Sequence, residues 1–240
     1  VLSSLETRGE YDPRYLDYQT SLTFRPNDKW KINFLGNISI NDYRFTPKDR
    51  QTNFGTSTDA KQFTVYFDGA EKDRFETWFG ALSLNFRPNR ANNFTLLASG
   101  FLSNELVSYD ISGEYWLDKA GTQEVGGELG VGRYHEHARN RLKASVFSFA
   151  FKGNTGISNH NLSYGVSLNT EKIMERTREW ERRDSAGYSL PFDPAALKVV
   201  YNLTSNHDTS SIRFAAYAMD TWKISTSAGY ISLNAGVRMS

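Results

Sequence analysis

Strict alternation of apolar and polar residues near the end of the chain is the feature that most limits how it can fold. Every second side chain from Ile231 to Met239 is apolar, and the side chains between them are small or polar. This period-two pattern predicts a β-strand with one apolar and one polar face. The segment 212–224 alternates in the same way, so we expect the two segments to form an antiparallel hairpin. Because the second strand runs to the last residue, we expect it to pair with a strand outside this chain.

The composition excludes several classes of protein. The 28 basic and 27 acidic residues nearly cancel, which gives no general attraction to nucleic acid. No cysteine is present, so disulfides and thiolate metal sites are excluded. No apolar run approaches the roughly 20 residues of a membrane-spanning helix. A spanning β-strand needs only about 9 to 11 residues with one apolar face, and the 14% of aromatic residues suits the girdles of a membrane β-barrel.

Alternation over the rest of the chain predicts about ten strands. They are expected at residues 18–25, 30–40, 78–86, 94–102, 107–117, 125–131, 142–151, 162–169, 212–224 and 229–240. The polar stretches 41–73 and 171–210 are expected to be long loops. In the seventh of these strands the register stays open, because Phe147 and Phe149 compete with Leu142 for the apolar face.

The expected connections differ between the two ends of the sheet. Bacterial outer-membrane barrels place short turns on the periplasmic side and longer loops outside. The chain follows this order, which predicts an all-β fold, an antiparallel transmembrane β-barrel; a soluble β-sandwich or propeller is the alternative. Short turns are expected at one end near residues 26, 89, 120, 155 and 226, and the other connections at 41–73, 103–106, 134–141 and 171–210.

Several stretches resemble a known family. The run Arg213 to Ile224 reads RFAAYAMDTWKI, and the following strand contains AGVR at 235–238. This hairpin resembles a segment of TonB-dependent outer-membrane receptors. Residues 79–89 look like a hairpin of such a receptor entering its periplasmic turn, and 113–117 and 137–142 are similar to receptors of the Bacteroidetes type.

The resemblance implies an architecture and a function. Receptors of this family build 22-stranded barrels around a plug, so we expect residues 1–240 to be a barrel segment of about ten strands, without the plug and the segment that recruits TonB. The implied function is TonB-dependent active uptake of a nutrient such as a siderophore, glycan or peptide, at the bacterial outer membrane. The implied partners are outer-membrane lipid, the extracellular nutrient, TonB through a segment not in this chain, and a surface lipoprotein, but no nucleic acid.

The residues alone leave other functions open. A passive porin, a ten-stranded outer-membrane protease and a soluble carbohydrate-binding β-sandwich would show similar alternation. No phosphate-binding loop, nucleophile elbow or zinc-protease helix occurs in the sequence. We therefore expect no enzymatic activity, no cofactor and no metal site.

Two histidines are candidates for substrate contacts. His135 and His137 would project from one face of an extended strand, with Glu136 on the other face. With a third ligand, the two imidazoles could share a metal ion. We favour the alternative, in which the three residues form an exposed loop tip between two strands.

Two tryptophans are further candidates. Trp116 shares a polar strand face with Asp110 and Glu114, so we expect it to face the barrel interior, where it could stack on a substrate. Trp180 lies among the mixed charges of 171–184. That segment is expected to be an extracellular loop, which either grips the substrate or is simply solvated, and we favour the solvated loop.

Overall fold

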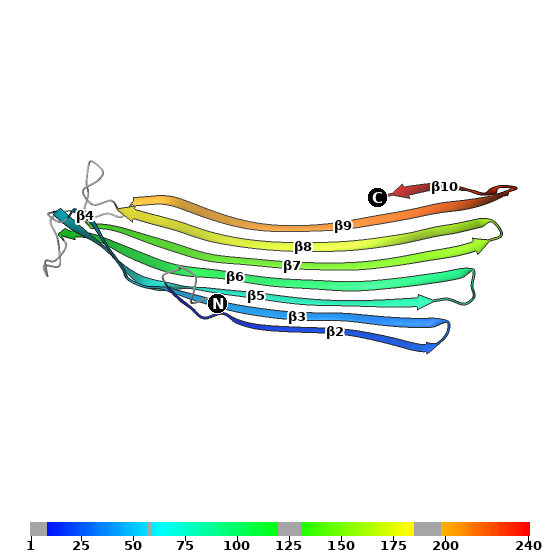
Figure 1. The fold of residues 1–240 in the computed structure, drawn as a ribbon, viewed down its shortest axis with the longest axis horizontal. Helices are drawn as coiled ribbons and strands as arrows, with labels where there is room; N and C mark the ends of the chain where they lie inside the picture. Colours follow the sequence, from blue (N-terminus) through cyan, green and yellow to red (C-terminus); the bar gives the residue numbers. More distant parts are fainter. Residues whose placement is uncertain (1–8, 57–58, 120–130, 185–197) are drawn as a thin grey trace.

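A single layer of antiparallel β-strands makes up the described structure (Figure 1). The computed structural model describes residues 9–56, 59–119, 131–184 and 198–240. No helix long and apolar enough to cross a membrane occurs among these residues. The strands are β1 (Gly9–Tyr11), β2 (Arg14–Asn27), β3 (Trp30–Pro47), β4 (Arg50–Thr56), β5 (Asp59–Phe86), β6 (Asn92–Lys119), β7 (Val131–Ile157), β8 (His160–Asp184), β9 (Lys198–Thr226) and β10 (Gly229–Met239).

The strands pair largely in chain order. From one edge of the sheet to the other the order is β1, β3, β5, β6, β7, β8, β9 and β10. β1 and β2 both pair with the same edge of β3, one after the other. β3 and β4 likewise pair with one edge of β5, one after the other. β2 and β10 therefore stand at opposite edges, and the sheet formed by the described residues is open (Figure 1).

Near the four short turns, one face of the sheet carries a continuous apolar belt. The turns join β2 to β3, β5 to β6, β7 to β8 and β9 to β10, and we call their end of the sheet the turn end and the opposite end the far end (Figure 1). Paired residues on antiparallel strands point to the same face, so the apolar positions of neighbouring strands add up. We call this face the belt face and the other the polar face. The apolar belt covers 16–24, 30–40, 78–86, 94–102, 147–157, 162–168, 212–224 and 231–239.

The apolar belt crosses the strands at a slant. Trp30 on β3 is joined through successive pairs to Val237 on β10. On β10, the apolar positions continue beyond Val237 toward the turns as far as Ile231, which is six residues further on. Six strand-to-strand steps lead from β3 to β10. A drift of about one residue per strand, at about 3.3 Å per residue and about 4.8 Å between strands, places the strands roughly 35° from the normal to the belt.

A row of aromatic rings marks the edge of the apolar belt at the turn end. The centroids of Trp30 and Phe86 lie 4.4 Å apart. Phe94 and Phe151 continue the row at 6.4 Å from Phe86 and 6.3 Å from Phe94, respectively. Tyr164 lies 6.3 Å beyond Phe151. Aromatic girdles of this kind border the apolar zone of membrane barrels.

The one carboxylate on the belt face near this edge has a partner. Asp220 is paired across the strands with Ala235, so its side chain lies on the belt face. Its Oδ2 lies 2.6 Å from Nδ1 of His160, whose ring stacks on Trp222 at 5.6 Å. The imidazole thus compensates a carboxylate that would otherwise be costly among apolar side chains.

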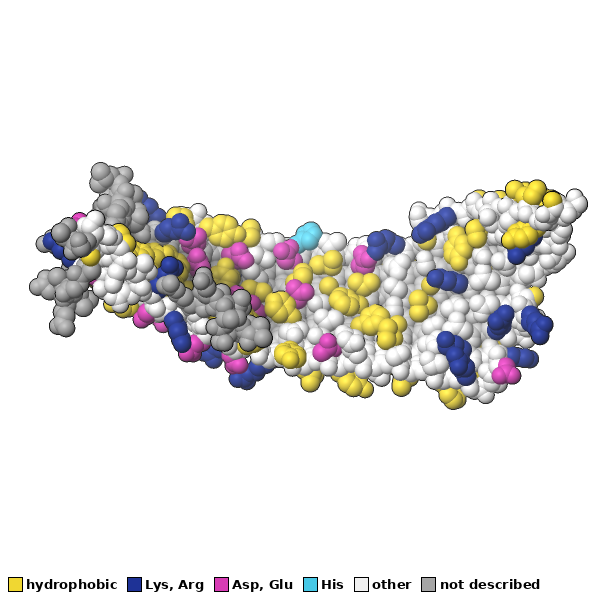
Figure 2. Space-filling model, viewed as in Figure 1, with side chains coloured by type: hydrophobic (Ala, Val, Ile, Leu, Met, Phe, Trp, Pro, Cys, Tyr) yellow, Lys and Arg dark blue, Asp and Glu magenta, His cyan; other side chains and the backbone are white. Residues whose placement is uncertain are grey.

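Basic and acidic side chains occupy different parts of the polar face. Lys and Arg side chains gather toward the turn end, and Asp and Glu side chains lie further along the strands (Figure 2). Lys31, Lys152 and Arg238 belong to the basic part, and Glu105 and Glu171 to the acidic part. Between the charges, this face carries mainly small and polar residues, which suits contact with water.

Toward the far end the two faces exchange their character. Along β6, the belt face changes from Phe94 and Leu102 to Asp110 and Glu114, whereas the polar face gains Tyr115. The far part of the belt face is therefore charged, and the far part of the polar face is aromatic. Within this one strand, the apolar side chains thus move from one face of the sheet to the other.

The described residues form almost no core. Among the described residues, Val65 and Ala138 are the only buried hydrophobic ones, and none of the large side chains is fully buried. The accessible surface is 16816 Å², whereas a compact monomer of 27.3 kDa would expose about 11,000 Å². The sheet thus leaves uncovered an apolar area that a water-soluble domain would bury.

Several predicted connections are wrong. The described residues form ten strands, the number expected, but β1 and β4 were not predicted. The supposed loops at 41–73 and 171–210 consist largely of strand: β3, β4 and β5 in the first, β8 and β9 in the second. Residues 103–106 lie inside β6 and 134–141 inside β7. Polar residues there occupy strand faces that meet water, so polarity did not indicate a loop.

Two further expectations concern turn position and register. The turn expected near residue 120 lies largely outside the described residues, but β6 ends at Lys119 at the far end, opposite the other four turns. The strand expected at 125–131 lies outside the described residues, apart from Val131 at the start of β7. The open register of 142–151 is resolved: Phe147 and Phe149 lie in the apolar belt, and Leu142 lies on the polar face.

One glycine in β5 is required by its backbone. Gly69 has φ 102°, and a Cβ added there would lie 1.9 Å from the carbonyl oxygen of Asp110. Backbone atoms cannot move aside easily, and side chains rarely adopt this φ. Gly80 in the same strand meets nothing within 4 Å of its added Cβ.

We expect the substitution Gly69→Ala to lower the free energy of unfolding by about 1 to 3 kcal/mol, since it combines backbone strain with a clash. Gly80→Ala is the matched control and should change it by less than about 0.5 kcal/mol. Urea unfolding of the protein in detergent micelles measures both. Equal effects at the two positions would contradict the conformation assigned to Gly69.

Candidate functional site

Three of the four candidate residues come together on the belt face, beyond the apolar belt. His137 pairs with Trp180 across β7 and β8, and its ring stacks on the indole at 4.9 Å. His135 meets the same indole edge-on at 4.8 Å. The prediction that His135, Glu136 and His137 form a loop tip is wrong, because β7 is paired on both sides there.

Asp110 of β6 organises this cluster, and sequence reasoning did not assign it there. His137 donates from Nδ1 to its Oδ1 at 2.5 Å, and Arg139 donates to its Oδ2. His135 Nε2 lies 3.7 Å from the same carboxylate. Burial alone would raise the pKa of Asp110, but the hydrogen bonds from His137 and Arg139 outweigh it and hold the pKa below its usual value.

The cluster is cationic and aromatic. The guanidinium of Arg182 lies 4.7 Å from the centre of the Trp180 ring, so the indole has a cation on its surface. The described residues contain no group of three or more His, Asp or Glu side chains arranged to hold a metal ion. The contacts of the cluster are thus made among its own side chains.

Trp116 lies apart from this cluster. It is on the belt face of β6, between Thr64 and Val131 in the pairing. Its indole N–H is buried and has no hydrogen-bond partner among the described residues. Trp116 shares a face with Asp110 and Glu114, as expected, but this face is continuous with the apolar belt, because the two segments predicted as 94–102 and 107–117 are one strand.

A second group of aromatic side chains lies on the far part of the polar face. Tyr11 contacts Tyr43 and Phe45, with ring centroids 5.8 and 4.7 Å away. On the next strands, Tyr115 stacks on Phe63 at 5.8 Å and on Tyr134 at 5.6 Å. Burial raises the pKa of both Tyr43 and Tyr134 to about 12, so these hydroxyls stay protonated at neutral pH.

Acidic side chains accompany these rings. Burial raises the pKa of Glu71, and the neighbouring Asp73 raises it further. Burial also raises the pKa of Asp73, while a backbone hydrogen bond from Ser108 and the hydrogen bond shared with Glu71 oppose this rise. Burial, then the charge of Glu181, raises the pKa of Glu136. Tyr201 donates to Oε2 of Glu179 at 3.1 Å.

We call the aromatic and acidic residues of the far polar face the acidic-aromatic surface. It comprises Tyr11, Tyr43, Phe45, Phe63, Phe67, Glu71, Asp73, Tyr109, Tyr115, Tyr134, Glu136, Glu179, Glu181 and Tyr201. Rings with hydroxyls and closely spaced carboxylates can bind planar groups by stacking and cations by charge.

Most of this surface was missed because its strands were expected to be loops. Alternation was present nevertheless: Phe63, Val65 and Phe67 occupy every second position in the stretch predicted to be polar loop. Their phase would have indicated a strand. The contribution of Tyr201 to the surface depends on strand pairing, which the sequence does not contain.

A scan against protein-family models finds no match, and a search of curated proteins finds none at the significance required.

Glu71→Gln should stabilise the protein at neutral pH, because a carboxyl whose pKa is raised by folding costs stability when it is ionised. We expect the melting midpoint at pH 7 to rise by about 1 to 3 °C. As pH falls through the folded-state pKa toward the ordinary value of 4.5, the difference from the wild type should vanish.

The measurement is thermal unfolding in detergent at pH 7 and near pH 4. Glu114→Gln is the control, since it removes an exposed carboxylate from the belt face. A midpoint at pH 7 that falls on Glu71→Gln would show that the carboxylate stabilises the fold instead.

Proposed function

We propose that this chain is part of the wall of an outer-membrane β-barrel, and that the whole protein is a receptor for TonB-dependent uptake of a nutrient. In this proposal the belt face meets lipid and the polar face lines the interior. The slanted apolar belt is the observation that carries the proposal. The TonB-dependent mechanism itself derives from the resemblance of Arg213 to Ile224 and the neighbouring stretches to that family.

The dimensions of the apolar belt support a membrane-spanning wall. It covers 9 residues in β5 and 11 in β3, and a tilted spanning strand needs about 9 to 11. The tilt of roughly 35° inferred from its slant agrees with the 35 to 45° that such barrels adopt. The aromatic row from Trp30 to Tyr164 would then lie at the periplasmic interface, beside the short turns.

The length of the strands supports a receptor with a deep vestibule. β5 to β9 contain 25 to 29 residues each. Since about 11 residues suffice for the membrane, the far parts would rise roughly 40 to 50 Å above it. The acidic-aromatic surface would line that vestibule and bind nutrients with planar or cationic groups.

This orientation changes how the predicted site residues are interpreted. His135, His137 and Trp180 share the belt face, so they would face outward above the membrane. Trp116 lies on the same face, which disfavours its predicted position in the interior. The acidic-aromatic surface replaces them as the candidate for substrate contacts.

Single cysteines test which face meets lipid, because the chain has none of its own. In β5, Ser83→Cys and Asn85→Cys lie on the polar face. In intact proteoliposomes they should react with a membrane-impermeant, water-soluble maleimide that can enter the barrel interior. Leu82→Cys and Leu84→Cys should react only with a lipid-soluble reagent. The same labelling at all four positions would refute a membrane-spanning β5, and heat-modifiable migration on gels verifies that each variant is folded.

Conductance separates a receptor from a porin. In planar bilayers, the full-length protein should give no open-channel current, because a plug would fill a receptor barrel. Urea at concentrations that unfold a plug but not the barrel should then induce channels. Steady conductance before urea treatment would favour a passive porin.

A further inference from the structure

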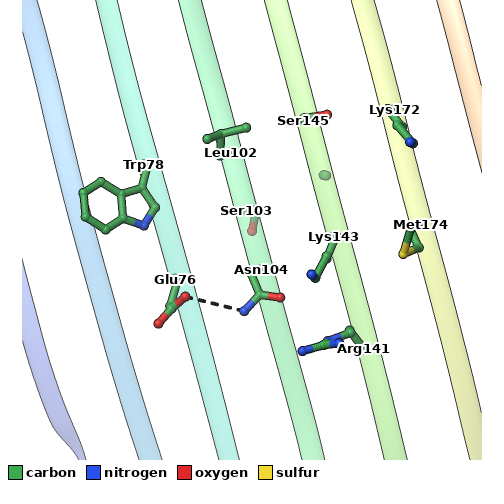
Figure 3. A pocket seen from close by; sticks show the side chains of 11 residues that line it. Glu76, Trp78, Leu102, Ser103, Asn104, Arg141, Lys143, Ser145, Lys172 and Met174 are labelled. Carbon is green, nitrogen blue, oxygen red and sulfur yellow. Dashed lines mark hydrogen bonds between the residues drawn. The ribbon is translucent and has the colours of Figure 1, made fainter.

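Three cations stand without ion-pair partners where the apolar belt ends toward the far end. Arg141 and Lys143 of β7 and Lys172 of β8 are exposed, and none makes an ion pair or side-chain hydrogen bond among the described residues. All three lie on the belt face, since Lys143 pairs with Asn104 and with Met174. Figure 3 shows them around one cavity.

Two nearby arginines of the same face, in contrast, form ion pairs. Arg74 lies 2.6 Å from Glu76 and 3.1 Å from Asp42. Arg176 lies 2.8 Å from Asp208. None of the three cations forms an ion pair among the described residues, although carboxylates are frequent on this face. The hydrogen bonds from Arg176 lower the pKa of Asp208, and Lys172 lies close enough for its charge to lower it further, but Asp208 is itself paired with Arg176. The three cations are therefore available to an external anion.

The cavity combines these cations with the rim of the apolar belt. It has a volume of about 510 Å³ and is lined by Arg141, Lys143 and Lys172 together with Trp78 and Leu102. Glu76 also lines it, but its carboxylate already binds Arg74 and accepts from Asn104 at 3.5 Å. An anionic group entering from the side would meet three cations and one engaged carboxylate.

An apolar groove begins where this cavity ends. Gly36, Gly80 and Gly100 are paired in one row across β3, β5 and β6, so three neighbouring strands lack side chains at the same level of the belt face. The groove has a volume of about 460 Å³ and is lined partly by Trp78 and Leu102, which also line the cationic cavity. The two spaces therefore adjoin one another along these two side chains.

We propose that this site binds one lipid of the membrane's outer leaflet, with a phosphate at Arg141, Lys143 and Lys172 and an acyl chain over the glycine row. The inference rests on the proposed function, since it needs the belt face to meet lipid. A phosphate-bearing, acylated lipid matches both halves of the site, whereas inorganic phosphate matches only the cationic half. Lipid A, which carries phosphates and several acyl chains, is the probe.

The experiment measures lipid A retained by the full-length protein in nanodiscs of phosphatidylcholine doped with lipid A, after extraction into mild detergent and native mass spectrometry. The triple substitution Arg141→Gln, Lys143→Gln and Lys172→Gln should reduce retention at least tenfold. The control removes two lysines and one arginine from the polar face: Lys31→Gln, Lys152→Gln and Arg238→Gln should leave retention unchanged.

A second variant tests the groove without changing charge. Gly80→Leu should fold, because a Cβ added at this position meets nothing within 4 Å. Its side chain would occupy the groove, so retention of lipid A should fall several-fold. Equal retention by the wild type and the triple variant would overturn the inference, as would complete displacement of lipid A by inorganic phosphate. Heat-modifiable migration and insertion into nanodiscs are measured on the same samples, and failure of the wild type in these assays would refute the proposed function itself.

Discussion

A single sheet cannot cover its own apolar face, and this constraint governs the rest of the structure. Backbone hydrogen bonding is satisfied between strands, but side chains such as Phe34, Leu82 and Phe149 have no second layer to pack on. Their burial depends on material outside the described residues. A lipid bilayer supplies such material on one face only, which agrees with the slanted apolar belt, the aromatic row at its edge and the polar opposite face.

The exchange of character between the two faces has the same physical origin. Where the apolar belt ends, the belt face acquires charged residues such as Arg74 and Asp110, as a surface in water requires. The polar face acquires rings such as Tyr43 and Tyr115 at the same height. Those rings pack against each other and against neighbouring carboxylates, so the far part of the sheet gains stability from side-chain contacts on its polar face.

Sequence periodicity predicted the part of the fold that carries the apolar belt and failed toward the far end. The strands 30–40 and 162–169 were recognisable because one face had to be apolar throughout. In β5 and β8, the far segments carry charged residues on both faces, so their alternation is weaker and was interpreted as loop. The continuity of β6 was missed because its apolar phase changes between Leu102 and Tyr109.

Contacts within the candidate sites depend on pairing that the sequence does not contain. Asp110 and His137 are 27 residues apart and meet only because β6 and β7 pair in one register. The row of Gly36, Gly80 and Gly100 likewise exists only in three dimensions. Local patterns identified His137 and Trp180 as unusual residues, but not the carboxylate that joins them to their neighbours.

The slant of the apolar belt also sets a rule for closing the sheet. A displacement of about one residue per strand means that a ring of such strands returns to its first member shifted by about as many residues as it has strands. The shear number then roughly equals the strand number, so the diameter follows from the strand count alone. A strand added beyond β10 must therefore be shifted by the same amount, or its apolar positions will fall outside the apolar belt.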